Sequence, residues 1–133
     1  MGKMKILVVD DERIVLDSCQ RVLEAEGFEV YLVPSANKAL QAMKKEGFGL
    51  LLVDIKMPEH DGMYLMREVK EKWADIPIIV MSGYPTTNTI EEAVKMEAAA
   101  FIAKPFTPDE LLETIRHIIQ KEEDHETKKS PSD

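Results

Sequence analysis

The chain contains a single cysteine, Cys19, so it cannot form an intramolecular disulfide. One unpaired thiol suits the reducing cytosol, and its place in a helical pattern indicates a small apolar residue rather than a reactive group. The sequence also has no apolar stretch of transmembrane length, and its first residues lead directly into a strand without a signal peptide. These absences predict a cytoplasmic protein that does not act at a membrane.

Basic residues are in the minority. The 17 Lys and Arg residues stand against 25 Asp and Glu residues, which gives a formal net charge of −8. This charge argues against direct binding of nucleic acid or of an anionic membrane surface. The 133 residues, 44% of them hydrophobic, suffice for one domain with a buried core and argue against a second.

Short apolar runs are the clearest structural signal, at residues 6–9, 50–53, 78–81 and 99–103. A run of this length, bounded by turn signals, is typical of a strand buried on both faces of a parallel sheet. The segment 28–33 alternates apolar and polar residues instead, which predicts a strand at or near the sheet edge.

Helical patterns separate these strands. The predicted helices cover about residues 12–26, a segment capped by Ser35 and closed by Gly47, residues 63–73, residues 89–98 and a segment that begins at Thr107. Strict alternation of strand and helix predicts an α/β fold of the (βα)₅ type: a doubly wound, five-stranded parallel sheet with helices on both faces.

The last two helices carry specific expectations. Thr89 and Glu92 form a possible capping box for the fourth helix. The apolar face of that helix is thin and consists of Ile90, Ala93 and Val94.

The fifth helix has the clearest start, with Thr107 as N-cap, Pro108 at N1 and Glu110 at N3. Beyond Gln120 no large apolar residue follows. Residues 122–133 are therefore predicted to be a disordered, charged tail or the start of a linker.

Polar residues follow the predicted strands at the points where they end: Asp10 and Asp11, Asp54, Ser82 and Lys104. Parallel strands end on one edge of a sheet, so these side chains are expected to meet in one crevice. Three carboxylates repel one another unless a cation is bound, and oxygen ligands are what Mg²⁺ prefers. Each residue alone has a plainer explanation: Asp11 could cap the following helix, Asp54 and Ser82 could be turn residues, and Lys104 could be solvated surface.

These residues carry a family resemblance. Asp10-Asp11, the segment 54–62, Ser82-Gly83 and Lys104-Pro105-Phe106 resemble the CheY-like receiver domain of two-component response regulators. The resemblance covers about residues 4–121, and it implies the flavodoxin-like strand order 2-1-3-4-5.

The resemblance also implies roles for individual residues. Asp54 would accept a phosphoryl group from the phosphohistidine of a sensor kinase. Mg²⁺ would be held by Asp10, Asp11, Asp54 and the backbone carbonyl of Lys56. Lys104 would pair with the phosphoryl group and Ser82 would move inward to hydrogen-bond it, while the bond before Pro105 would be cis. Mg²⁺ and an ammonium would neutralise the charge of such a transfer.

Three positions modify this expectation. The aromatic switch position is Phe101, which has no hydroxyl, so its inward and outward states cannot differ by a phenolic hydrogen bond. Lys56 and Tyr84 occupy the two positions that, by resemblance, flank the attacking water. A long cation and a bulky ring there are expected to shield the acyl phosphate.

Other functions are less well supported. An aspartyl-phosphatase enzyme would need a general acid where Lys56 stands. A flavin-binding module would need a hydroxyl- and glycine-rich loop after the first strand, whereas residues 10–13 are mostly acidic. A receiver used only for docking or as an adaptor would not need the full set of five site residues.

The expected function is therefore that of a phosphoacceptor switch rather than a turnover enzyme. The expected partners are a sensor histidine kinase or a phosphotransfer protein on the input side. On the output side, a downstream effector or a second copy of the chain is expected to dock on the face formed by residues 89–120.

Overall fold

The computed structural model describes residues 3–56, 62–83 and 86–128. Within these ranges five parallel strands form one sheet in the order β2-β1-β3-β4-β5, which is the order that the family resemblance implies. The strands are β1 (Lys5–Val9), β2 (Glu29–Val33), β3 (Leu50–Asp54), β4 (Ile78–Ser82) and β5 (Ala100–Ala103). The sheet therefore confirms the predicted strands and the predicted edge position of the second.

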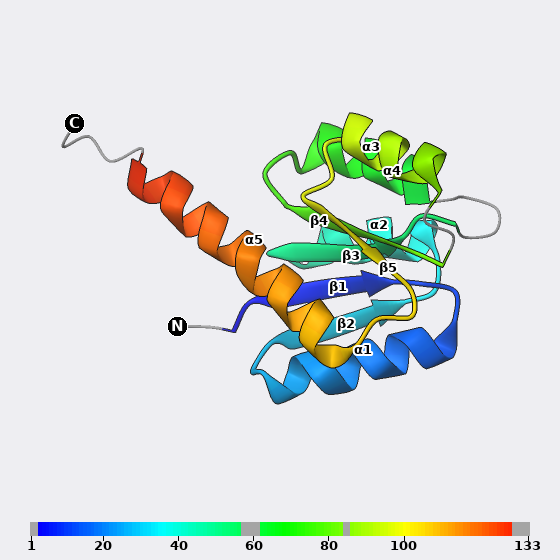
Figure 1. Cartoon of the computed structure of the whole chain (residues 1–133), viewed down its shortest axis with the longest axis horizontal. Helices are drawn as coiled ribbons and strands as arrows, with labels where there is room; N and C mark the ends of the chain where they lie inside the picture. The colour runs from blue at the N-terminus through cyan, green and yellow to red at the C-terminus, as the bar shows by residue number, and fades with distance from the viewer. Residues whose placement is uncertain (1–2, 57–61, 84–85, 129–133) are drawn as a thin grey trace.

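Helices cover both faces of the sheet (Figure 1). They are α1 (Arg13–Ala25), α2 (Ala36–Lys45), α3 (Gly62–Lys72), α4 (Thr87–Lys95) and α5 (Pro108–Lys128). Helices α1 and α5 pack on one face, and α2, α3 and α4 pack on the other. Among the described helices, none combines the length and the apolar content that a membrane crossing requires.

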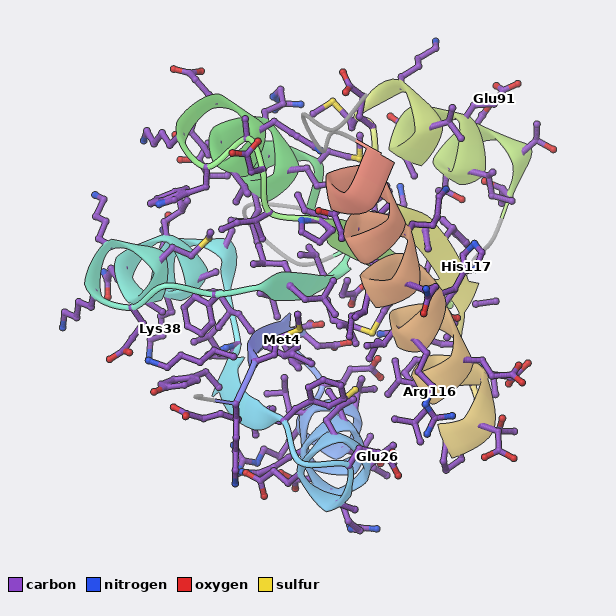
Figure 2. The ribbon with its side chains drawn as sticks, turned by 90° about the vertical axis from the view of Figure 1, so that its left-hand side faces the viewer. Met4, Glu26, Lys38, Glu91, Arg116 and His117 are labelled. Atoms are coloured by element: carbon purple, nitrogen blue, oxygen red, sulfur yellow. The ribbon has the colours of Figure 1, made fainter. Side chains whose placement is uncertain are left out.

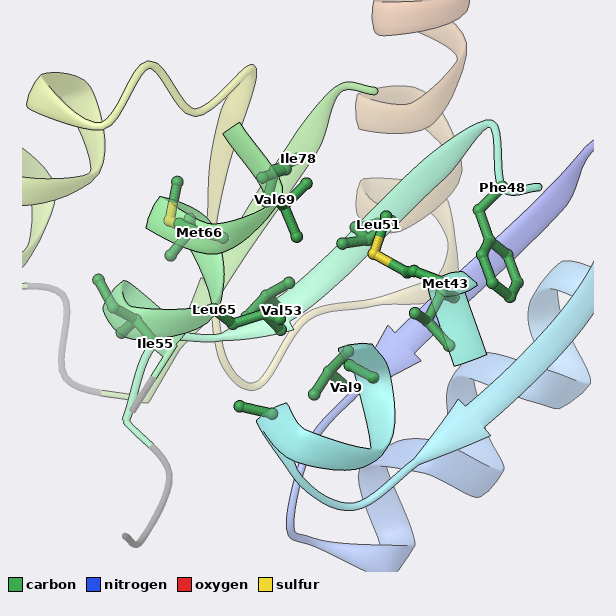
Figure 3. Close-up of a cluster of buried hydrophobic side chains, with 14 of the residues drawn as sticks. Val9, Met43, Phe48, Leu51, Val53, Ile55, Leu65, Met66, Val69 and Ile78 are labelled. Atoms are coloured by element: carbon green, nitrogen blue, oxygen red, sulfur yellow. The ribbon is translucent and has the colours of Figure 1, made fainter. Parts of the chain in front are cut away.

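The central strands β1, β3 and β4 supply most of the core because they are covered on both sides. Alternate residues point to opposite faces, so Leu51 and Val53 contact the α2 and α3 side while Leu50 and Leu52 contact the α1 and α5 side. Figure 3 shows the first of these clusters, in which Met43 of α2 approaches the sheet. A doubly covered sheet explains why these strands are continuous apolar runs.

Helix α1 ends in a Schellman motif. The N–H of Phe28 donates to the carbonyl of Leu23 at 3.1 Å, and the N–H of Gly27 donates to Glu24 at 3.0 Å. Gly27 has φ +95°, a conformation that favours glycine.

The start and the exposed face of α4 correct the sequence prediction. The N-cap is Thr86, whose hydroxyl accepts the Thr89 N–H at 3.2 Å, so the predicted box between Thr89 and Glu92 is wrong. Thr89 lies within the helix, where its side chain is buried and its hydroxyl donates to the Thr86 carbonyl at 2.9 Å. Several cap-competent residues follow one another here, and the prediction chose the last of them.

The apolar face expected for α4 is also only partly correct. Ala93 is buried against the sheet, but Ile90 is 39% exposed and Val94 is 69% exposed. The helix therefore presents two large apolar side chains to solvent instead of packing them inward.

Helix α5 has the predicted capping box and a greater length than predicted. The Glu110 N–H donates to Thr107 Oγ1 at 3.1 Å, and the Thr107 N–H donates to Glu110 Oε1 at 2.7 Å. The helix continues to Lys128, past the point after Gln120 where the sequence predicts a disordered tail, and its last turns extend beyond the sheet (Figure 1). Arg116 of α5 forms an ion pair at 2.9 Å with Glu26, the C-cap residue of α1, which links the two helices on this face (Figure 2).

Candidate functional site

The register of the parallel strands brings the predicted site residues to one edge of the sheet. Val9 pairs with Val53, so Asp10 and Asp54 are the next residues along neighbouring strands. Ser82 is the last residue of β4 and pairs with Ala103, and Lys104 follows directly. The Lys104 N–H then donates to the Ser82 carbonyl at 2.8 Å, which fixes the backbone at this corner.

Lys104 is the centre of the site. Its ammonium lies 2.7 Å from Asp10 Oδ2, 3.1 Å from Glu12 Oε1 and 3.2 Å from Asp54 Oδ2. The lysine side chain is 12% exposed, whereas the Asp10 and Asp54 side chains are 0% and 6% exposed. One cation therefore holds three carboxylates together, two of which are almost fully removed from water.

Asp54 is oriented by the backbone around it. Its Oδ1 accepts the Lys56 N–H at 3.0 Å, which leaves Oδ2 directed at the Lys104 ammonium. Gly62, the first residue of α3, lies against this segment, and a Cβ there would clash with the Asp54 carbonyl oxygen and come within 2.7 Å of Ile55 Cα. The absence of a side chain at residue 62 is thus what lets α3 begin directly behind Asp54.

Among the residues that the structure describes, no hydrogen-bond donor satisfies one oxygen of Asp10. Its Oδ1 accepts the Glu12 N–H at 2.9 Å. Its Oδ2 is buried and contacts Lys104 only as an ion pair, outside hydrogen-bond geometry. Buried polar oxygens normally have such donors, so this atom is suited to a cation.

Burial sets the protonation behaviour of the site. Loss of water raises the pKa of Asp10, although the Lys104 ammonium and the Glu12 N–H oppose this effect. Burial also raises the pKa of Asp54, helped by the charge of Asp10 and opposed by the Lys56 N–H and by Lys104. For Lys104 burial works in the other direction, but the carboxylates of Asp10, Glu12 and Asp54 outweigh it, and its pKa is raised.

The three carboxylates that converge differ from the predicted three in one member. Oxygens of Asp10, Glu12 and Asp54 all lie within 4.8 Å of one another, while Asp11 is exposed and outside this group. The sequence places Glu12 only at the start of a predicted helix, and the periodic pattern carries no signal for the direction of its side chain. Glu12 occupies the N-cap position of α1, but its side chain makes no capping hydrogen bond. Asp11 is therefore not the N-cap, which excludes the alternative explanation of Asp11 as a helix cap.

The group of carboxylates fits a divalent cation. Asp10 and Asp54 have carboxylate oxygens within 4.8 Å of each other, the kind of ligand that Mg²⁺ takes in proteins, while the Glu12 carboxylate is the exposed partner of Lys104.

Two of the remaining predicted residues, Ser82 and Phe101, lie within the described strands. Ser82 is fully buried at the end of β4, and Phe101 of β5 is partly buried against the cluster that includes Ala93. The Lys104–Pro105 peptide bond is cis, as the resemblance implies. Tyr84 and residues 57–61 lie outside the described residues.

The single thiol is structural, as predicted. Cys19 is 1% exposed in the core beneath α1. Burial, with a contribution from the charge of Asp10, raises the pKa of Cys19 to about 12, so the reactive thiolate is not populated near neutral pH.

Comparison with known families identifies this arrangement. A model of the response regulator receiver domain matches residues 6–116. The chain belongs to the response regulator receiver domain family. It is therefore a receiver domain of two-component response regulators, which are signalling proteins and not a catalytic enzyme family.

The sequence relatives include transcriptional regulatory proteins. The transcriptional regulatory protein FixJ of Bradyrhizobium diazoefficiens is 34% identical over 121 residues, which are 91% of this chain and 59% of FixJ. ZraR of Salmonella typhimurium is 36% identical over 114 residues, which are 86% of this chain and 26% of ZraR. The chain thus spans between about a quarter and three fifths of these relatives.

Solved structures agree on the fold. A CheY-like receiver domain protein from Methanospirillum hungatei superposes with a TM-score of 0.88 at 32% identity, covering 93% of this chain and 99% of that one. A response regulator from Thermotoga maritima gives a TM-score of 0.82 at 31% identity, covering 89% and 98% of the two chains.

Proposed function

We propose that Asp54 accepts a phosphoryl group from the phosphohistidine of a sensor histidine kinase or phosphotransfer protein, in a Mg²⁺-dependent transfer. The observation that carries this proposal is the direction of Asp54 Oδ2. The Asp54 side chain is almost fully buried, its Oδ2 is not used by the Lys56 N–H, and this oxygen lies 3.2 Å from the Lys104 ammonium.

In the proposed transfer, Asp54 Oδ2 attacks phosphorus, the phosphorus–nitrogen bond of the donor breaks, and the released imidazole takes up a proton. The product is an acyl phosphate on Asp54. Bound Mg²⁺ would supply positive charge for the transferring oxygens. Asp10, Asp11, Asp54 and the Lys56 carbonyl are proposed to hold it. Burial raises the pKa values of Asp10 and Asp54, and the positive charge of a bound cation would favour their ionised forms again.

The other site residues act on the phosphoryl group. Lys104 is proposed to bind a phosphoryl oxygen with its ammonium, and Ser82 to hydrogen-bond another oxygen as it moves inward. That movement opens space for Phe101, so the switch works by packing because phenylalanine has no hydroxyl. Lys56, which is exposed beside Asp54, is proposed with Tyr84 to slow hydrolysis of the acyl phosphate.

The surface formed by residues 89–120 is proposed to be the docking site for the downstream partner. Phosphorylation would bias a two-state equilibrium in α4, β5 and the adjoining face of α5. The exposed Ile90 and Val94 support this choice because they give a docking partner, either an effector or a second copy of the chain, apolar surface to bury. We expect this exchange to take place in the cytoplasm, without direct contact to nucleic acid or a membrane.

The proposal is tested by incubation with acetyl phosphate and Mg²⁺, followed by intact-mass measurement. We expect one phosphoryl group, labile to hydroxylamine, in the parent and none in Asp54→Ala. Equal and stable uptake by Asp54→Ala would show that another residue is the acceptor.

A further inference from the structure

Glu12 has a side chain that its local structure does not use. It occupies the N-cap position of α1 with extended backbone angles, φ −96° and ψ 115°, but its carboxylate makes no capping hydrogen bond. Its backbone is fixed independently, since its N–H donates to Asp10 Oδ1 at 2.9 Å and its carbonyl accepts the Leu16 N–H at 3.2 Å. The carboxylate instead reaches across to Lys104, 92 positions away in the chain.

This contact occupies a donor that the phosphoryl group needs. The Lys104 ammonium donates hydrogen bonds to Glu12 Oε1 at 3.1 Å and to Asp54 Oδ2 at 3.2 Å, and it forms an ion pair with Asp10 Oδ2 at 2.7 Å. A phosphoryl oxygen that binds this ammonium therefore competes with three carboxylates for it. Glu12 is the one that water can most easily replace, because its side chain is 58% exposed while those of Asp10 and Asp54 are almost completely buried.

Charge repulsion points to the same residue. The Glu12 and Asp54 carboxylate oxygens lie within 4.8 Å of each other, so anionic phosphoryl oxygens on Asp54 would come close to an anionic Glu12. The Glu12 carboxylate also has room to leave. With Lys104 it lines a cavity of about 490 Å³, together with Ser18, Gly83 and Pro105.

We infer that Glu12 is a positioning residue that occupies the Lys104 ammonium in the unphosphorylated protein and competes with the phosphoryl group for it. The inference rests on the proposed phosphorylation of Asp54. A contact that exists in the ground state and is lost in the transition state slows a reaction, so Glu12 restrains phosphorylation. The restraint is modest, because an ion pair with one exposed partner changes an equilibrium by about two- to fivefold.

The test is a double-mutant cycle of Glu12→Gln and Lys104→Met, read as the rate of phosphorylation by acetyl phosphate at saturating Mg²⁺. We expect Glu12→Gln to accelerate phosphorylation about two- to fivefold when Lys104 is present, and to have a clearly smaller effect in the Lys104→Met background. Asp17→Asn is the matched control, since it removes the same charge from α1 at a residue that pairs with Arg13, and its rate should equal that of the parent.

A second measurement does not depend on phosphorylation. In the metal-free protein, Glu12→Gln should accelerate exchange of the Lys104 ammonium protons with water, as measured by nitrogen-15 NMR, and Asp17→Asn should not. A slower phosphorylation of Glu12→Gln, an equal gain in both lysine backgrounds, or unchanged ammonium exchange would each overturn the inference. If the parent itself takes up no phosphoryl group, the proposed function fails instead.

Discussion

Replacing Lys104 by methionine should show how strongly one cation holds the site together. The substitution keeps most of the side-chain volume but leaves Asp10, Glu12 and Asp54 facing one another without a counter-charge. Removal of one partner from a buried ion pair lowers the free energy of unfolding by about 3–5 kcal/mol. Because Glu12 is exposed to water, we expect a loss near the lower end of this range, about 3 kcal/mol. Urea unfolding at pH 7 without metal measures this loss.

The pH dependence distinguishes a charge effect from lost packing. The pKa values of Asp10 and Asp54 are already raised by burial, and Lys104 lowers both, so its removal raises them further. A carboxyl whose folded pKa is raised contributes stability below its unfolded pKa, and this contribution is lost as pH rises through the folded pKa. The deficit of Lys104→Met should therefore be largest near neutral pH and shrink as pH falls towards 4.

Mg²⁺ gives a second test of the same substitution. A divalent cation supplies the missing charge, so it should restore more stability to Lys104→Met than it adds to the parent. Lys5→Met is the matched control, because Lys5 pairs with Glu46 at the surface and should show neither effect. A variant as stable as the parent at pH 7, or a deficit independent of both pH and Mg²⁺, would refute the reasoning.

Three further substitutions test separate features. Gly62→Ala should lower the free energy of unfolding by about 1–3 kcal/mol and slow phosphorylation, because its Cβ would push against the Asp54–Ile55 backbone. Gly47→Ala is the control, since the space around its Cβ is open, and it should change neither the urea unfolding nor the phosphorylation rate. Glu97→Gly should raise the free energy of unfolding by about 0.5–1 kcal/mol, because residue 97 has φ +61°; Glu97→Ala should give no gain, and an equal gain would contradict the strain argument. Asp11→Asn should weaken Mg²⁺ binding in calorimetry without lowering metal-free stability, and unchanged Mg²⁺ affinity would remove Asp11 from the site.

Most of the fold could be predicted because the central strands are buried on both faces. Continuous apolar runs such as residues 50–53 leave little choice of structure, and the residues that follow them must then surface on one edge of a parallel sheet. The convergence of Asp10, Asp54 and Lys104 follows from that topology alone, and the structure confirms it.

The errors occur where side-chain direction or local competition decides the outcome. In α4, Thr86 and Thr89 are both suitable N-cap residues. Thr86 is the N-cap in the structure, and Thr89 is a buried residue within the helix. Glu12 was missed because a residue at a helix start has an obvious local role, and only the spatial position of Lys104 shows that its carboxylate is used elsewhere. The contact of Gly62 with the Asp54 backbone depends on a packing distance that no sequence pattern encodes.

The most direct test of the central claim is to trap the phosphorylated residue itself. After incubation with acetyl phosphate and Mg²⁺, borohydride reduction converts an acyl phosphate on aspartate to homoserine, which peptide mass spectrometry can locate. We predict conversion at Asp54 alone, lost when Mg²⁺ is removed. Conversion at Asp10 or Asp11, or none at Asp54 in protein that carries a phosphoryl group, would contradict the assignment of Asp54 as the acceptor.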